Sequence, residues 1–175
     1  MLELRPERPG DEEAIAEVNR RAFGGEEEVG IIAAVRGSEY FIPELSLVAE
    51  QDGRIIGHIM FSSITLVRFD RPAEKILSLA PMAVDPEMQN KGTGSALVQA
   101  GMEKARELGH TVVIVIGHPG YYPRFGFRQA RMLGYDIGME VPDEVFMAAG
   151  LQPDALQDAG GMVQFSPPFN TGTQE

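Results

Sequence analysis

The chain has 175 residues, a length that suits one compact domain. It contains no cysteine, which excludes disulfides, thiolate metal sites and a cysteine nucleophile. Its 26 acidic residues outnumber its 15 Lys and Arg residues and give a net charge of −11. Nucleic-acid binding, which depends on clustered basic side chains, is therefore not expected.

The sequence also gives no sign of membrane association or export. No apolar run approaches the roughly 20 residues of a membrane span, and the acidic N-terminal stretch lacks the apolar segment of a signal peptide. We therefore expect a cytoplasmic protein. One folded domain is expected over residues 1–168, with a frayed tail over 169–175, because the Pro167-Pro168 pair follows the last expected strand.

Periodicity predicts alternating helices and strands. In the first half we expect a strand at 2–5, helices from Asp11 to about Gly24 and at 26–36, and strands at 45–50, 54–66 and 75–84. In the second half we expect a helix after a loop at 89–94, a buried strand at 111–116, helical turns at 121–126, strands near 137–141 and 161–166, and a helix near 142–149. The Asp52-Gly53 pair predicts a hairpin turn.

The loop at 89–94, Gln-Asn-Lys-Gly-Thr-Gly, stands between an expected strand and an expected helix. Unpaired N–H groups and the helix dipole make such a helix start attractive to anions, and glycines allow a phosphate to approach. The loop is not a P-loop and lacks the third glycine of the dinucleotide fingerprint. It matches the pattern Q/R-x-x-G-x-G at Gln89, Gly92 and Gly94. The alternative is a loop whose glycines merely interrupt the helix.

Two motifs resemble those of the GNAT superfamily of N-acetyltransferases. The segment LAPMAVDPEMQNKGTGSALVQAGMEKARELG at 79–109 resembles motif A, and Tyr122-Pro123-Arg124-Phe125-Gly126-Phe127 is similar to the Y-x-x-x-G-F of motif B. The resemblance implies an α+β (mixed α/β) fold with a central mixed, mostly antiparallel sheet flanked by helices. In that fold a splayed pair of parallel strands, here about 76–84 and 111–116, binds acetyl-CoA.

The resemblance also implies roles for particular residues. The backbone of Met82, Ala83 and Val84 would hold the pantetheine arm, although ordinary strand residues would give the same pattern. The pyrophosphate would be surrounded by Gln89, Asn90, Lys91, Gly92, Thr93, Gly94 and Ser95. Lys91 could instead be a solvated surface lysine.

The resemblance implies a separate role for each of three residues in and next to motif B. Tyr122 would lie near the coenzyme sulfur and either protonate the departing thiolate or hydrogen-bond it; the alternative is an aromatic packing residue. Tyr121 would point elsewhere, as core or substrate wall. Arg124 would reach the 3′-phosphate or adenine of CoA, or be a surface arginine.

The implied reaction is direct transfer of an acetyl group from acetyl-CoA to a small-molecule or peptide amine, with an oxyanion stabilised by a backbone N–H near Met82. Some GNAT enzymes carry a glutamate on the strand before the loop, whereas this chain has Ala80-Pro81-Met82-Ala83. His58, His118, Glu26, Glu44 or water therefore remain as candidates for the base. The three histidines show no metal-ligand spacing, so no metal is expected.

Other possibilities stay open from the sequence. A non-catalytic CoA or acyl-CoA sensor or docking module is the alternative to an enzyme, because function belongs to the site and not to the fold. Dimers are common in the superfamily, so a homodimer is allowed. The tail from 136 to 175 has seven acids and no Lys or Arg. By analogy it would supply half of the acceptor pocket and favour a cationic acceptor such as a polyamine, aminoglycoside or lysine side chain, unless it is only a solvated acidic surface.

Overall fold

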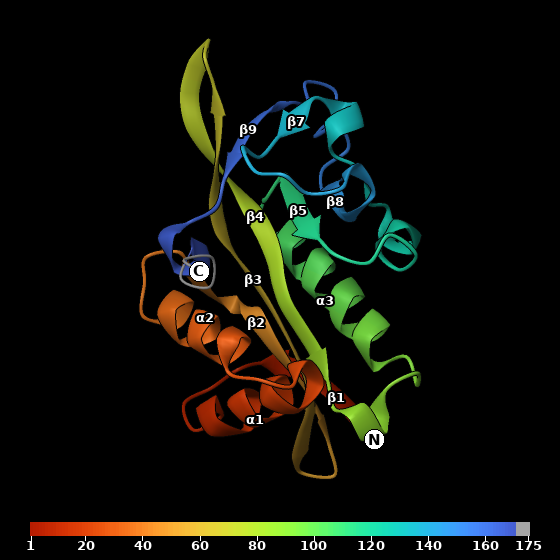
Figure 1. The fold of residues 1–175 in the computed structure, drawn as a ribbon. Helices are drawn as coiled ribbons and strands as arrows, with labels where there is room; N and C mark the ends of the chain where they lie inside the picture. Colours follow the sequence, from red (N-terminus) through yellow and green to blue (C-terminus); the bar gives the residue numbers. More distant parts are fainter. Residues whose placement is uncertain (171–175) are drawn as a thin grey trace.

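A single twisted sheet organises the computed structural model, which describes residues 1–170 (Figure 1). Its strands are β1 (Leu2–Pro6), β2 (Phe41–Gln51), β3 (Arg54–Arg68), β4 (Arg71–Val84), β5 (Val112–Ile116), β6 (Arg128–Gln129), β7 (Tyr135–Asp136), β8 (Phe146–Gly150) and β9 (Gly161–Gln164). The main path runs β1-β2-β3-β4-β5-β8-β6, and β9 pairs with both β3 and β7. All pairs on the main path are antiparallel except β4 with β5.

Three α-helices cover the two faces of the sheet (Figure 1). They are α1 (Glu12–Phe23), α2 (Glu27–Arg36) and α3 (Thr93–Glu107). Alternate residues of a strand point to opposite faces, and β2 shows the consequence: Leu47 and Ala49 belong to the core under α3, whereas Val48 packs with Ile15 and Ile32 under α1 and α2. The sheet is therefore buried on both faces, as expected for a mixed sheet flanked by helices.

The parallel pair β4 and β5 is joined over a very short length. Only Leu77 with Val113 and Ser78 with Ile114 are paired. Beyond them β4 continues to Val84 along β3, with a change of register near Ala80-Pro81. Since β5 ends at Ile116, the two strands separate at their carboxyl ends. The expected splayed strand pair is thus present.

Two of the expected elements in the second half are wrong. Residues 142–149 do not form a helix: after a 3-10 turn at Asp143–Val145 they form β8 along β5. Phe146 and Met147, which are adjacent in β8, belong to different core clusters, so the strand buries side chains on both faces of the sheet. This burial outweighs the preference of Met and Ala residues for a helix. The strand near 137–141 is also absent, and the paired residues are only those of β7.

The end of the described chain is packed. Residues Pro167–Asn170 form a 3-10 turn, and the ring of Phe169 lies 5.5 Å from that of Phe165, centroid to centroid. Of the tail expected to fray over 169–175, residues 171–175 lie outside the described part. None of the helices in residues 1–170 is long and apolar enough to cross a membrane.

Candidate active site

Two adjacent cavities open where β4 and β5 separate. The first, called here the loop cavity, has a volume of about 730 Å³ and lies between the end of β4, the 88–95 segment and the turn at 118–124. The second, the strand cavity, has a volume of about 420 Å³ and lies between residues 79–82, the end of β5 and helix α2. Phe23, Met82, His118 and Tyr121 line both cavities. The two spaces therefore meet around these four side chains.

The glycines shape the loop cavity. Gly92 has a φ of 87° immediately before α3, and Asn90 has a φ of 63°, both in the left-handed region. A Cβ at Gly94 would lie 3.0 Å from the Tyr121 hydroxyl and 3.4 Å from Met82, so a larger residue would crowd the space. The N–H groups in the first turn of α3 have no partner within the helix, and the helix dipole adds partial positive charge there.

Most of the residues predicted to bind the coenzyme lie around this one cavity. The nine that line it are Met82, Ala83, Val84, Gln89, Asn90, Gly92, Thr93, Gly94 and Ser95. Lys91, the tenth, is exposed and does not line it. The side-chain amide of Gln89 donates a hydrogen bond to the Val84 carbonyl at 3.1 Å, which ties the loop to the end of β4.

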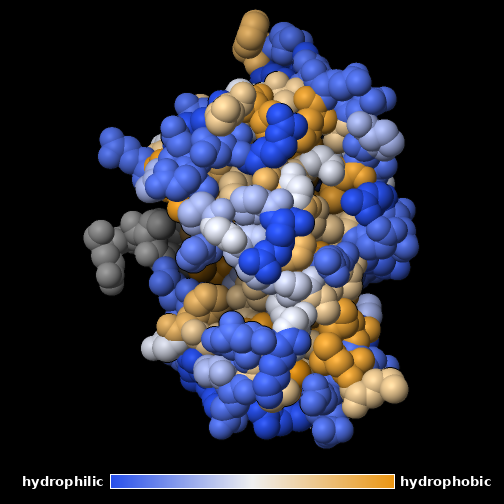
Figure 2. Space-filling view, turned by 90° about the vertical axis from the view of Figure 1, so that its right-hand side faces the viewer, coloured by the Kyte–Doolittle hydropathy of each residue, from blue (hydrophilic) through white to orange (hydrophobic). Residues whose placement is uncertain are grey.

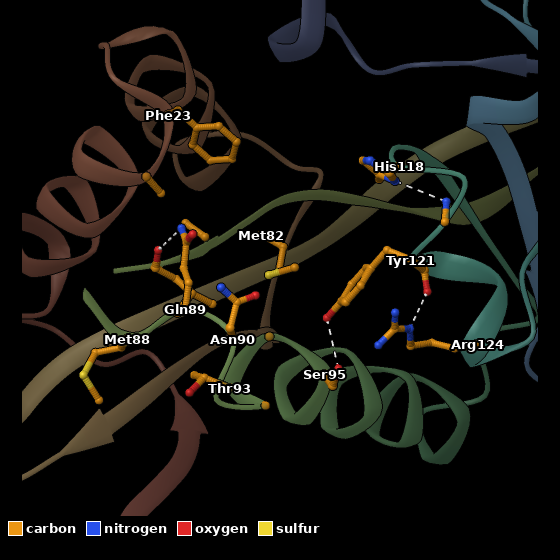
Figure 3. A pocket seen from close by; sticks show the side chains of 16 residues that line it. Phe23, Met82, Met88, Gln89, Asn90, Thr93, Ser95, His118, Tyr121 and Arg124 are labelled. Carbon is orange, nitrogen blue, oxygen red and sulfur yellow. Dashed lines mark hydrogen bonds between the residues drawn. The ribbon is translucent and has the colours of Figure 1, made fainter. Parts of the chain in front are cut away.

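Tyr121 points into the loop cavity and also lines the strand cavity, so its ring forms a wall that the two cavities share (Figure 3). Its hydroxyl lies 3.2 Å from the hydroxyl of Ser95, in the first turn of α3. The guanidinium of Arg124 stands 4.7 Å from the centre of the Tyr121 ring and donates to its carbonyl at 3.0 Å. Arg124 also lines the loop cavity, where it brings a permanent positive charge to an acidic protein.

Tyr122 forms part of the wall of the strand cavity. Its ring packs 5.6 Å from that of Phe127, centroid to centroid, and a Cβ at Gly117 would lie 2.5 Å from it. Burial, with a smaller contribution from Tyr121, raises the pKa of Tyr122 to about 12. Within the described chain its hydroxyl has no hydrogen-bond partner. The phenol is therefore neutral at ordinary pH and free to donate.

The strand cavity is largely apolar. Leu79, Pro81, Val115 and Ile116 form one side of it, across from residues of α1 and α2. In the space-filling view a hollow left of centre exposes apolar surface between hydrophilic side chains (Figure 2). Among the described lining residues, Glu28 is the one acid, and there is no Lys or Arg.

Three of the four side chains considered as a base lie away from both cavities. His58 is fully buried between Asn19 and Ser46, at 3.3 and 3.1 Å from its two ring nitrogens, and burial lowers its pKa to about 3. Glu26 is exposed and pairs with Arg20. Glu44 is exposed on β2.

His118 is the only one of the four that lines the cavities. Its Nδ1 accepts a hydrogen bond from the Gly120 N–H at 3.2 Å. A neutral ring in this arrangement carries its proton on Nε2, so Nδ1 is the acceptor and Nε2 the donor. No group of three or more His, Asp or Glu that could hold a metal occurs in residues 1–170.

The tail from residue 136 was expected to border the acceptor pocket with its acidic side chains, but it borders the site with an aromatic one. None of its acids within the described residues lines either cavity, whereas the ring of Phe169 lines the strand cavity. Phe169, Glu28 and Phe23 also line the strand cavity, and they are not among the site residues predicted from the sequence. No local signal separates Glu28 from its neighbours Glu26 and Glu27, since only the docking of α2 beside the splayed strands gives it a distinct position.

The chain is similar to known proteins both in sequence and in fold. The sequence model of the acetyltransferase (GNAT) family matches residues 13–127. The uncharacterized N-acetyltransferase YjhQ of Escherichia coli K12 is 37% identical over 169 residues, covering 93% of this chain and 91% of that protein. The crystal structure of E. coli YhbS in complex with CoA covers 97% of this chain and 92% of its own, with a TM-score of 0.88 and 28% identity. An acetyltransferase from Brucella melitensis in complex with acetyl-CoA gives a TM-score of 0.78 and 29% identity, covering 97% and 98%.

Proposed function

Because the chain belongs to the GNAT family of acetyltransferases, we propose that it transfers an acetyl group from acetyl-CoA to a primary amine by direct attack in a ternary complex. The observation that carries the proposal is the gathering of nine motif residues around one cavity at the separated ends of β4 and β5. Two similar structures, from E. coli and B. melitensis, contain CoA and acetyl-CoA.

The loop cavity suits the coenzyme in shape and charge. Its volume of about 730 Å³ falls in the range of ligand pockets. Gly92 and Gly94 leave the backbone of the loop accessible, so that N–H groups at the start of α3 can bind the pyrophosphate. Arg124, at the rim, would bind another phosphate group of CoA. Lys91 does not line the cavity and would act only through its charge.

The backbone at 82–84 would hold the pantetheine arm, and the reaction would take place between the two cavities. Acetyl-CoA supplies a thioester whose carbonyl carbon the amine attacks. Pro81 has no N–H, so the N–H of Met82 is the first donor after the change of register in β4, and it would stabilise the negative charge that develops on the carbonyl oxygen. Tyr122 would donate a hydrogen bond to the sulfur as the carbon–sulfur bond breaks. The proton lost by the amine would pass to water.

Two measurements test the proposal in sequence. Thermal unfolding of the protein with increasing acetyl-CoA should show a saturable rise in stability, of about 2.7 kcal/mol at 100 times the Kd, that NAD and ATP do not produce. Release of the CoA thiol should then depend on an added primary amine. A melting curve unchanged at millimolar acetyl-CoA would refute coenzyme binding. Binding without amine-dependent release would refute the transferase and leave a CoA-binding module.

A further inference from the structure

The strand cavity combines an apolar wall with one carboxylate. Glu28 stands in the first turn of α2, half-buried, and lines this cavity. In residues 1–170 it forms no ion pair, unlike Glu26, whose carboxylate binds Arg20. A carboxylate that borders a cavity without a protein partner can bind a cation or a hydrogen-bond donor there. Glu28 is therefore available to a positively charged ligand.

The remaining surface of the cavity favours an apolar ligand. Phe23 and Ile116 are 45% and 40% exposed, although both are large apolar residues. Ile31 and Phe169 complete the side formed by α2 and the end of the described chain. A ligand that covers these side chains gains free energy in proportion to the apolar area that it removes from water.

A second positive charge on the ligand would have no partner there. The acids of the 136–170 segment line neither cavity, and Glu28 can neutralise one ammonium. Burying another ammonium against Val115 or Phe169 would require its desolvation without an opposite charge. The structure thus disfavours the polyamine and aminoglycoside acceptors that the acidic tail suggested.

We infer that the acceptor is an apolar monoamine, a primary amine on an alkyl or aryl group, whose ammonium is held by Glu28 in the strand cavity. This inference rests on the proposed function, because it assigns the acceptor of the same site. It narrows the acceptor from any primary amine to an apolar one with a single positive charge, and it makes Glu28 a binding residue for the amine. The loop cavity would hold the coenzyme on the other side of Met82 and Tyr121.

The test compares two amines of equal length, hexylamine and 1,6-diaminohexane, at saturating acetyl-CoA. Thiol release should give a kcat/KM at least tenfold higher for hexylamine, after correction for the two equivalent amines of the diamine. Glu28→Gln should raise the KM for hexylamine about tenfold, the value expected for loss of a charge-assisted hydrogen bond, and leave the KM for acetyl-CoA unchanged. The matched control is Glu27→Gln, an exposed neighbour outside both cavities, which should stay within twofold of wild type.

A binding experiment separates this inference from the proposed function. Hexylamine should add a saturable thermal shift to the CoA-loaded protein, with the diamine and Glu28→Gln giving weaker effects. That result would support binding of an apolar amine by Glu28 even if the protein transferred no acetyl group. Equal or better use of the diamine, or a Glu28→Gln protein indistinguishable from Glu27→Gln, would overturn it. So would faster transfer from hexanoyl-CoA than from acetyl-CoA, because the cavity would then hold the acyl chain.

Discussion

Replacing Tyr122 by Phe tests how the leaving sulfur is stabilised. The change removes one hydroxyl and keeps the ring, which packs against Phe127 and closes over Gly117. Since the hydroxyl has no hydrogen-bond partner within residues 1–170, the folded protein should lose little stability. Any large change in rate would then come from the reaction itself.

The expected size of the effect follows from the pKa of the phenol. Burial raises the pKa of Tyr122 to about 12, whereas a thiol such as that of CoA has a pKa near 8.5, taken from cysteine. Full proton transfer from Tyr122 to the thiolate would be uphill by about 3.5 pKa units, or about 5 kcal/mol. A hydrogen bond to the thiolate avoids this cost and contributes about 1.5–3 kcal/mol. We therefore expect Tyr122→Phe to lower kcat by roughly 10- to 150-fold.

The assay is thiol release at saturating amine and acetyl-CoA between pH 6 and pH 10. Because the folded-state pKa lies above this range, neither wild type nor Tyr122→Phe should show an ionisation that belongs to Tyr122. Tyr121→Phe, which loses only the contact with Ser95, should change kcat a few-fold at most. A fall above 1,000-fold with loss of a basic limb from the pH profile would identify Tyr122 as a proton donor and refute this reasoning. A fall below threefold would show that the hydroxyl does not reach the sulfur.

Two further predictions concern stability. A Cβ at Gly101 would lie 2.2 Å from the ring of the fully buried Phe61, so Gly101→Ala should lower the free energy of unfolding by about 1–3 kcal/mol in urea titrations. The control Gly30→Ala, in a helix with open space around it, should raise it by up to about 1 kcal/mol, and equal effects would refute the packing argument. His58 has a folded pKa of about 3, below the unfolded value near 6.5. The unfolded chain thus binds one more proton between these values, and stability should fall by about 1.4 kcal/mol per pH unit from His58 as the pH drops below 6.5. His58→Gln should lack this component, and an unchanged slope would contradict it.

The sequence by itself determined the elements whose pattern is local. The helical spacing of α3, the glycines at 92 and 94 and the β-branched run of β5 each follow from interactions between near neighbours in the chain. These elements carry the motifs that resemble the GNAT superfamily. The fold, the family and the enzyme class were therefore predicted correctly, and nine of the ten expected coenzyme residues lie around one cavity.

Tertiary structure decided what depends on distant partners. β8 is a strand because its residues complete the sheet beside β5, although their composition favours a helix. His58 is buried, and Tyr121 faces Ser95, because of how α1 and α3 pack on the sheet. Glu28 lines a cavity, whereas its neighbours Glu26 and Glu27 do not, because of where α2 docks beside the separated strands. The physical reason is the same in each case: burial and charge neutralisation depend on surroundings supplied by remote parts of the chain, and these have no signature in the local sequence.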